Sequence, residues 1–91
     1  MKQDINSNWI ENIPRLQWAC RRGMLELDVL LGNFLKEAYL QLSLPDKLLF
    51  IQLLQCSDQE LFSWLIGHKT PKDNKLAKIV KKIYQHARSR M

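Results

Sequence analysis

The sequence is short of glycine, cysteine and long apolar runs, and each shortage excludes a class of protein. Three scattered glycines cannot build the glycine-rich turns of a Rossmann dinucleotide site or of a P-loop. The longest apolar stretch, around residues 48–54, is far below the roughly 20 residues of a membrane-spanning helix. Cys20 and Cys56 stand outside any CxxC pattern, which indicates two reduced thiols and no disulfide framework.

Signals for targeting, metal binding and catalysis are also missing. The first residues carry acids and lack the apolar core of a secretory signal, so we expect an unprocessed, cytoplasmic protein. His68 and His86 are isolated near expected helix ends, where solvated or capping roles are expected, and no ligand cluster indicates a metal. Arg21 and Arg22 beside Cys20 could lower its thiol pKa, but no histidine is placed to assist it. We therefore expect a protein that is not an enzyme.

Positive charge is what the chain has in excess. Its formal net charge is +5, which favours an acidic partner or nucleic acid. More than half of the fourteen basic residues lie in the last quarter of the chain: Lys69, Lys72, Lys75, Lys78, Lys81, Lys82, Arg88 and Arg90. The excess charge therefore belongs to one terminal helix, whose lysines form either a solvated face or a phosphate-binding surface. No recognition-helix pattern supports the reading of bases.

Apolar residues recur at helical spacing along most of the chain, and neither strand alternation nor an internal repeat is present. We predict helices over residues 14–21, 25–42 and 44–55, a fourth that begins after Ser57 and is closed by Gly67, and a fifth that begins after Thr70. The third is apolar nearly all round and is predicted to be central. The sequence thus predicts an all-α, compact five-helix bundle in one domain of residues 1–91, with a flexible leader over about residues 1–12.

Capping signals mark the expected helix starts. Asn12 is the expected N-cap of the first helix, just ahead of Pro14. Three capping boxes, in which a hydroxyl and a later acid each satisfy a backbone N–H, are predicted: Ser43 with Asp46, Ser57 with Glu60, and Thr70 with Asp73. Pro45 and Pro71 are expected in the opening turns of their helices. Gly32, inside the second helix, is expected to mark a close helix crossing.

The most distinctive stretch is residues 18–28, where polar side chains surround a glycine between two expected helices. Gly23 would separate the helices, and Glu26 would lie in the first turn of the second, able to reach the backbone N–H of Gly23. That capping interpretation leaves Arg21 and Arg22 unexplained, because guanidinium groups suit recognition of a partner's carboxylates or backbone. On local grounds, capping and recognition are equally supported.

At these residues the sequence resembles the succinate dehydrogenase flavinylation factors, the SdhE type of bacterial assembly factor. Their hallmark, Arg-Gly-x-x-Glu, is met by Arg22, Gly23 and Glu26. The flanks are also similar: Trp18-Ala19-Cys20-Arg21, Leu27-Asp28, and the segments 50–56 and 61–65. The resemblance covers about residues 16–85, and the leader before Pro14 and the lysine-rich last helix have no clear counterpart in it.

The resemblance implies an assembly factor that binds the flavoprotein subunit of succinate dehydrogenase, or of the related fumarate reductase. The factor promotes covalent attachment of FAD to a histidine of that subunit. FAD is then the partner's cofactor, and we expect the chain to hold none stably, to have no membrane span and to act as a monomer. The partner-binding residues are predicted to be Arg22, Gly23, Glu26, Arg21, Asp28 and Trp18.

Taken with the resemblance, the residue types give a docking mechanism as a hypothesis. Gly23 lets a partner's backbone approach closely, Arg22 together with Arg21 pairs with its acceptors, and Glu26 pairs with its donors, so that the FAD and the histidine implied by the resemblance are aligned. Two other function classes stay open. One is a small regulatory or nucleic-acid-binding module, antitoxin-like, that uses the basic last helix. The other is a redox or hydrolytic enzyme that uses Cys20.

Overall fold

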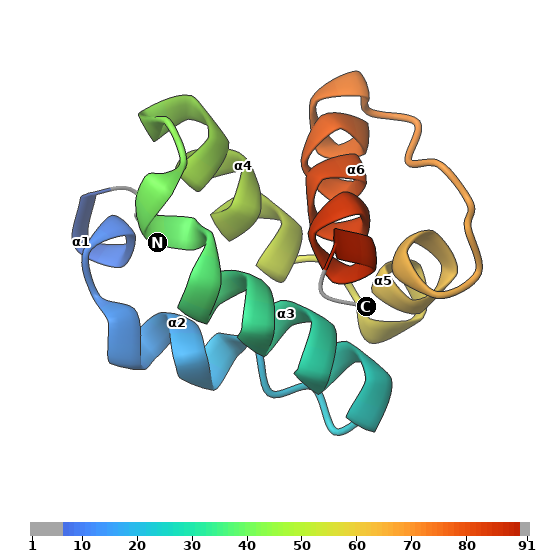
Figure 1. Ribbon diagram of the computed structural model, residues 1–91, viewed down its shortest axis with the longest axis horizontal. Helices are drawn as coiled ribbons and strands as arrows, with labels where there is room; N and C mark the ends of the chain where they lie inside the picture. The colour runs from blue at the N-terminus through green and yellow to red at the C-terminus, as the bar shows by residue number, and fades with distance from the viewer. Residues whose placement is uncertain (1–6, 90–91) are drawn as a thin grey trace.

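The five helices expected from the sequence are present in the computed structural model, which describes residues 7–89 (Figure 1). They are α2 (Ile13–Ala19), α3 (Leu25–Glu37), α4 (Leu44–Leu54), α5 (Asp58–Leu65) and α6 (Asn74–Ser89). A four-residue helix α1 (Ser7–Ile10) precedes them, and a 3-10 turn η1 (Tyr39–Gln41) follows α3. The described residues contain no strand, so the fold is all-α, as predicted.

The core lies between α3, α4 and α6. Phe50, Ile51 and Leu53 of α4 are fully buried, and α4 packs most extensively against α6. Phe34 and Tyr39 lie beside Phe50, with ring centroids 5.4 and 5.6 Å from it. A helix that is apolar on nearly every side needs neighbours on several sides. The buried residues of α4 therefore confirm its prediction as the central helix.

Helix α3 ends at Glu37, five residues earlier than the sequence predicts. The chain turns there because Tyr39 inserts its ring fully into the core and its hydroxyl donates a hydrogen bond to Ile10 O at 2.8 Å. These contacts end the helix at Glu37, although apolar residues recur at helical spacing as far as residue 42. Trp9 and Ile10 pack against the core, so residues 7–12 of the expected leader belong to the fold. Residues 1–6 of that leader lie outside the described residues.

The capping predictions for α2 and α5 are confirmed, and the one for α4 is half right. Asn12 Oδ1 accepts a hydrogen bond from the backbone N–H three residues later at 3.2 Å. Ser57 and Glu60 form a complete capping box. Ser43 accepts a hydrogen bond from Asp46 N at 3.3 Å, but the Asp46 carboxylate turns toward α6 and not to the backbone. Local spacing therefore identifies the caps, while tertiary contacts decide where the acid points.

The capping box predicted at Thr70 is wrong. Helix α6 begins at Asn74, and the carboxylate of Asp73 caps it, because Asp73 Oδ1 accepts from the backbone N–H groups of Lys75 at 2.8 Å and Leu76 at 3.3 Å. A carboxylate directly ahead of a helix satisfies the same free N–H groups as a serine or threonine. The neighbouring proline at position 71 is buried in the loop and not in the first turn of the helix.

Charged groups help to hold α6 against its neighbours. Asp46 of α4 is buried, with carboxylate oxygens 3.5 Å from Lys78 Nζ and 3.7 Å from Lys82 Nζ. Nε2 of His86 lies 3.1 Å from Glu37 Oε1 of α3, and most of the imidazole is covered. The expectation of a solvated or capping role is therefore wrong for His86, which contacts α3, whereas Lys78 and Lys82 stay substantially exposed while their ammonium groups lie beside Asp46 of α4.

Gly32 differs from its predicted role, whereas Gly67 ends α5 as the sequence predicts. No atom lies within 4 Å of the position that a Cβ would take at Gly32, so the predicted close helix crossing there is wrong. At Gly67 a Cβ would lie 2.9 Å from the carbonyl oxygen of Ser63, which explains the need for glycine after α5. The residue with left-handed backbone is the next one, His68, with a φ of 62°. Gly67 and His68 together therefore close α5.

Candidate functional site

The junction between α2 and α3 carries the motif, and Gly23 shapes its backbone. Gly23 has a φ of +83°, in the left-handed region that residues with a Cβ rarely adopt. The residue is exposed, and no atom lies within 4 Å of the position a Cβ would take. Glycine is therefore required here by the backbone conformation, and the space beside it is open to a partner.

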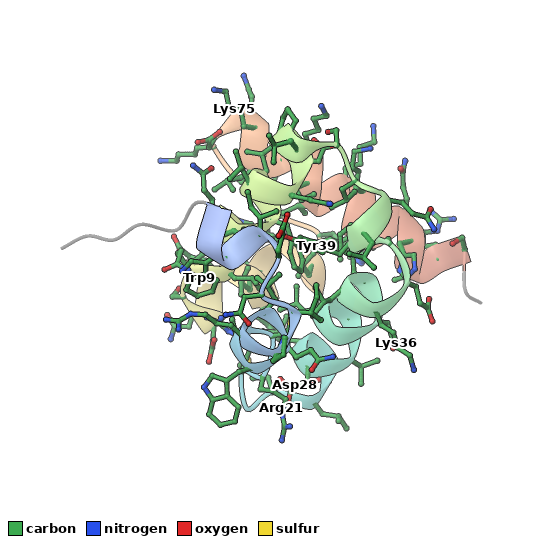
Figure 2. All side chains as sticks on the ribbon, turned by 90° about the vertical axis from the view of Figure 1, so that its left-hand side faces the viewer. Trp9, Arg21, Asp28, Lys36, Tyr39 and Lys75 are labelled. Carbon is green, nitrogen blue, oxygen red and sulfur yellow. The ribbon has the colours of Figure 1, made fainter. Side chains whose placement is uncertain are left out.

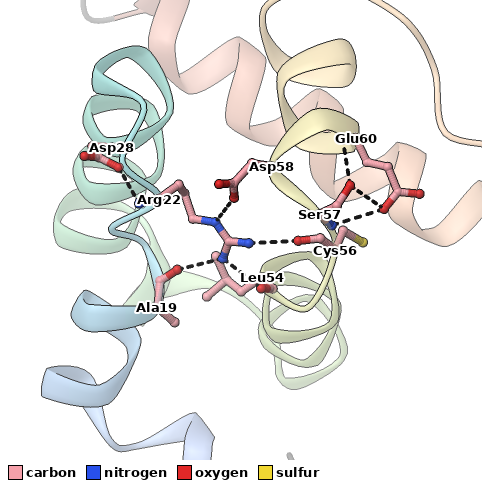
Figure 3. A network of polar contacts seen from close by, with 8 residues as sticks. All are labelled: Ala19, Arg22, Asp28, Leu54, Cys56, Ser57, Asp58 and Glu60. Atoms are coloured by element: carbon pink, nitrogen blue, oxygen red, sulfur yellow. Dashed lines mark hydrogen bonds and ion pairs between the residues drawn. The ribbon is translucent and has the colours of Figure 1, made fainter.

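The side chain of Arg22 is folded under this junction (Figure 3). Its Nε donates a hydrogen bond to Asp58 Oδ1 at 2.8 Å, and Nη1 donates to Ala19 O and Leu54 O at 2.9 Å each. Nη2 donates to Cys56 O at 2.8 Å, and only 15% of the Arg22 side chain is exposed. Because these acceptors lie at the ends of α2 and α4 and the start of α5, one guanidinium joins three helix ends.

Asp28 completes this arrangement. Its Oδ1 accepts a hydrogen bond of 2.6 Å from the backbone N of Arg22, across the turn that contains Gly23. Glu26, for which the sequence predicts a bond to the Gly23 N–H, is exposed and has no hydrogen-bond or ion-pair partner among the described residues. The capping prediction for Glu26 is therefore wrong, and its carboxylate is free. Direct partner contact by Arg22 and Asp28 stays a prediction, but their hydrogen bonds favour a positioning role.

Exposed side chains gather around the junction. Trp18, near the end of α2, is 75% exposed, and Arg21 just after it is exposed with no ion-pair partner in the described part of the chain. On the first turns of α3, Leu25 is 75% exposed and Val29 is 49% exposed. Large apolar side chains that gather on a surface mark interaction sites. The segment 18–29 therefore presents an apolar surface that carries unpaired charges of both signs.

Leu25 and Val29 are candidate site residues that sequence reasoning missed. They lie four residues apart and so share one face of α3. That face differs from the buried stripe of Leu27, Leu31 and Phe34. Their position outside the stripe that packs into the core was the signal in the sequence that could have identified them.

A groove of about 430 Å³ lies between α2 and α3 beside the motif. Trp18 and Arg21 line it from the α2 side, and Asp28, Gly32 and Lys36 line it from α3. The missing side chain at Gly32 leaves this part of the α3 surface open. Figure 2 shows Arg21 and Asp28 together at one end of the molecule, away from Lys75 at the other end. The groove thus places three of the predicted site residues, Trp18, Arg21 and Asp28, beside a hollow that a partner segment can enter.

The thiols do not form a reactive centre. Burial raises the pKa of Cys20 to about 12, and the nearby Arg22 guanidinium offsets only part of that rise. Burial also raises the pKa of Cys56. The lowered thiol pKa considered from the sequence is therefore wrong, because desolvation outweighs the charge of the arginine. Among residues 7–89 no three potential metal ligands are grouped together, and no helix is both long and apolar enough to cross a membrane.

Comparison with known proteins matches residues 14–87 to the family described as "Flavinator of succinate dehydrogenase". The protein named FAD assembly factor SdhE from Shewanella oneidensis is 56% identical over 69 residues, which cover 76% of this chain and 84% of that protein. The relative of the same name from Photorhabdus laumondii is 47% identical over 81 residues, 89% of this chain and 92% of its own. The one from Coxiella burnetii is 46% identical over 71 residues, 78% and 87% of the two chains.

The matched range includes α2 to α6 almost completely, so the lysine-rich last helix belongs to the family's common region. The prediction that this helix has no counterpart in the family is therefore wrong. The names of the relatives describe assembly factors and not enzymes, as the motif and its flanks imply. Because the family match covers most of the sequence and its relatives align along most of their own lengths, this chain belongs to the family of flavinators of succinate dehydrogenase.

Proposed function

We propose that this chain is an assembly factor that binds the flavoprotein subunit of succinate dehydrogenase and promotes covalent attachment of FAD to a histidine of that subunit. Membership of the flavinator family supports the function. One structural arrangement supports the location of the binding site. Exposed side chains surround Gly23, which has empty space beside it, and the buried guanidinium of Arg22 holds the α2–α3 junction in place. We name this site the junction surface, and it consists of Trp18, Arg21, Gly23, Leu25, Glu26 and Val29.

The junction surface has the properties of a protein-docking site. Trp18 and Leu25 offer exposed apolar area, and buried aromatic anchors commonly contribute much of the binding energy at an interface. Arg21 and Glu26 carry opposite charges that no described residue neutralises, so each can pair across an interface and fix the orientation of the partner. The bare backbone at Gly23 leaves room for the partner's main chain.

Arg22 and Asp28 act as positioning residues in this proposal. The hydrogen bonds of Arg22 to three helix ends fix how α2 and α3 present Trp18 and Leu25. The bond from Asp28 to the Arg22 backbone fixes the turn at Gly23. A surface that is rigid before binding loses less conformational entropy when the complex forms.

The chemistry of attachment belongs to the flavoprotein and FAD. Holding reacting groups in the right geometry can remove about 7–11 kcal/mol from a barrier. The proposed role of this chain is to keep the flavoprotein in a conformation where FAD and the histidine are aligned, without itself keeping FAD bound. The proposal includes a monomeric factor acting in the cytoplasm, and extends to the fumarate reductase flavoprotein as a second target.

Co-expression of the flavoprotein subunit with variants of this chain tests the proposal. The variants are Trp18→Ala, Glu26→Lys and Gly23→Asn, the last chosen because asparagine tolerates left-handed backbone while filling the open space. Gln52→Ala is the matched control, since Gln52 is exposed on α4. Covalent FAD is read as fluorescence of the flavoprotein band in a denaturing gel. We expect a loss of about fivefold or more for each junction variant and none for the control.

Two results would overturn the proposal at different levels. Undiminished covalent FAD with all three variants would remove the junction surface as the docking site. Equal covalent FAD with and without the wild-type chain would remove the function itself. The same assay with the fumarate reductase flavoprotein decides whether that subunit is a target, and light scattering of the purified chain tests the monomeric state.

A further inference from the structure

A second group of exposed side chains lies on α5, on α6 and on the loop between them, which form the right-hand side of Figure 1, whereas α1 and α2 form the left-hand side. A pocket of about 350 Å³ opens there. We name it the loop pocket, and it is lined by Trp64, His68, Lys69, Thr70, Pro71, Ala77, Val80, Lys81 and Tyr84. None of these residues belongs to the junction surface.

The loop pocket contains cations and no acid. Lys69 and Lys81 are exposed, and neither ammonium group has an ion-pair partner among the described residues. Lys78 and Lys82, by contrast, form ion pairs with the buried carboxylate of Asp46. Lys81 of α6 and Lys69 of the preceding loop thus bring two unpaired positive charges to the pocket, which fits an anionic ligand.

The floor of the loop pocket is apolar. Pro71 and Val80 are buried, while Trp64 and Ala77 are half-buried and complete the lining. Binding pockets typically combine such an apolar lining with a few polar groups that fix orientation. Here the lysines and the hydroxyl of Thr70 are the polar groups, so the ligand needs an apolar part beside its negative charges.

The aromatic ring of Tyr84 argues against nucleic acid as that ligand. His68 meets this ring nearly perpendicularly with centroids 5.1 Å apart, and the Arg88 guanidinium lies 5.9 Å from the ring centroid. Single-stranded nucleic acids bind by stacking bases on open aromatic faces. His68 and Arg88 already contact Tyr84, so they compete with a stacked base for this ring, and the lysines beside an apolar lining favour an acidic polypeptide.

We propose that the loop pocket is a second docking site, which binds an acidic polypeptide segment of a partner protein. One aromatic or aliphatic side chain of the segment sits on the apolar floor, and flanking carboxylates pair with Lys69 and Lys81. His68 holds the loop over α6 through its contact with Tyr84, in a left-handed conformation that is uncommon for a residue with a Cβ. The site is separate from the junction surface, so one molecule can engage both surfaces at the same time.

An NMR titration of the full chain with a short synthetic peptide tests the site. The peptide is rich in glutamate and aspartate and contains a single phenylalanine. We expect amide shifts confined to α5, α6 and their loop, and about tenfold weaker binding when serine replaces the phenylalanine. The Lys69→Gln, Lys81→Gln double variant is expected to bind about fivefold more weakly. The Lys36→Gln, Lys75→Gln double variant loses the same charge outside the pocket and is the matched control, expected to bind as wild type does.

Several outcomes would overturn the proposal. Equal losses in the two double variants would show attraction by net charge alone, and equal binding of the serine peptide would remove the apolar anchor. Shifts confined to residues 18–29 would place the peptide on the junction surface. Tighter binding of a single-stranded oligonucleotide with the same shifts would make nucleic acid the ligand. Because no flavoprotein is used, failure of the flavinylation assay and failure of this titration are separate results.

Discussion

Arg22 Nε donates a hydrogen bond to Asp58 Oδ1 at 2.8 Å, and this pair connects the α2–α3 junction to the first turn of α5. The same guanidinium reaches the carbonyl oxygens of Ala19, Leu54 and Cys56. A planar group with five donors is suited to several acceptors at once, whereas a lysine ammonium is a compact point charge. The motif therefore needs arginine for the fold itself, in addition to any contact with a partner.

Replacement of Arg22 by lysine is expected to lower the free energy of unfolding by about 2–3 kcal/mol, because buried carbonyl oxygens lose their donors. Urea unfolding of the wild type and of Arg22→Lys measures this difference. Arg21→Lys is the matched control, since Arg21 is exposed and unpaired among the described residues, and it should change stability by less than about 0.5 kcal/mol. Equal stability of the two variants would contradict the positioning role of Arg22.

Gly23→Ala is expected to cost about 1–2 kcal/mol of stability through backbone strain at a φ of +83°. Steric collision makes no contribution, because no atom lies within 4 Å of the added Cβ. Gly23→Asn is expected to cost less than Gly23→Ala, since asparagine visits this conformation more readily. Thermal unfolding of the three proteins gives the order, and greater stability of the alanine variant than of the asparagine variant would contradict it.

The buried thiol of Cys20 is expected to make the protein less stable in alkali. Its pKa is raised from 9.0 to about 12 in the folded state, so above pH 9 the unfolded chain loses a proton that the folded protein retains. Stability therefore falls as pH rises from about 9 to 12, by about 1.4 kcal/mol per pH unit from this group, and is unaffected by it below pH 9. Urea unfolding across this range measures the slope.

A Cys20→Ala variant isolates this contribution, because burial also raises the pKa of Tyr39 and of Cys56, which act in the same direction. The variant is expected to start less stable than the wild type at neutral pH, since it leaves a small cavity. Its stability should then fall less steeply above pH 9. Parallel curves for the two proteins would show that the Cys20 thiol does not carry the effect.

Because Lys78 and Lys82 both lie beside the carboxylate of Asp46, we expect the effects of replacing them on stability to be coupled. Lys78→Gln or Lys82→Gln alone is expected to cost less than about 1 kcal/mol, because both lysines are substantially exposed and the other remains near the acid. The double variant leaves a buried charge unpaired and should cost more than the sum of the two single changes. Urea unfolding of the four proteins measures the interaction, and simple additivity would show that the lysines act independently.

Local signals in the sequence predict much of the helical frame. Ser57 and Glu60 announce the start of α5 because both partners of the capping box lie within one helical turn. The end of α3 has no such local signal, because it depends on the burial of Tyr39 and on its hydrogen bond to Ile10, which lies 29 residues earlier in the sequence. Local spacing thus locates the start of α5, but it misplaces the start of α6 and misses the end of α3, which tertiary contacts determine.

The candidate site is predictable in position but not in the roles of its residues. The motif and its flanks identify the segment 18–28, yet the acceptors of the Arg22 side chain lie up to 36 residues away and three of them are backbone carbonyls. Every residue carries a carbonyl, so side-chain identity gives no sign of such partners. Exposure of Leu25 also depends on which face of α3 meets its neighbours, which periodicity alone leaves open.

The hydrogen bonds of Arg22 have a consequence for local unfolding. The junction cannot open without also releasing the carbonyls that end α4 and the aspartate that begins α5, so the two chain turns form one cooperative unit. A protein that binds the junction and suppresses its opening should therefore slow amide hydrogen exchange in the first turn of α5, a helix it need not touch. Slower exchange in α5 would then show that a partner is bound at the motif, although α5 lies more than 30 residues later in the sequence.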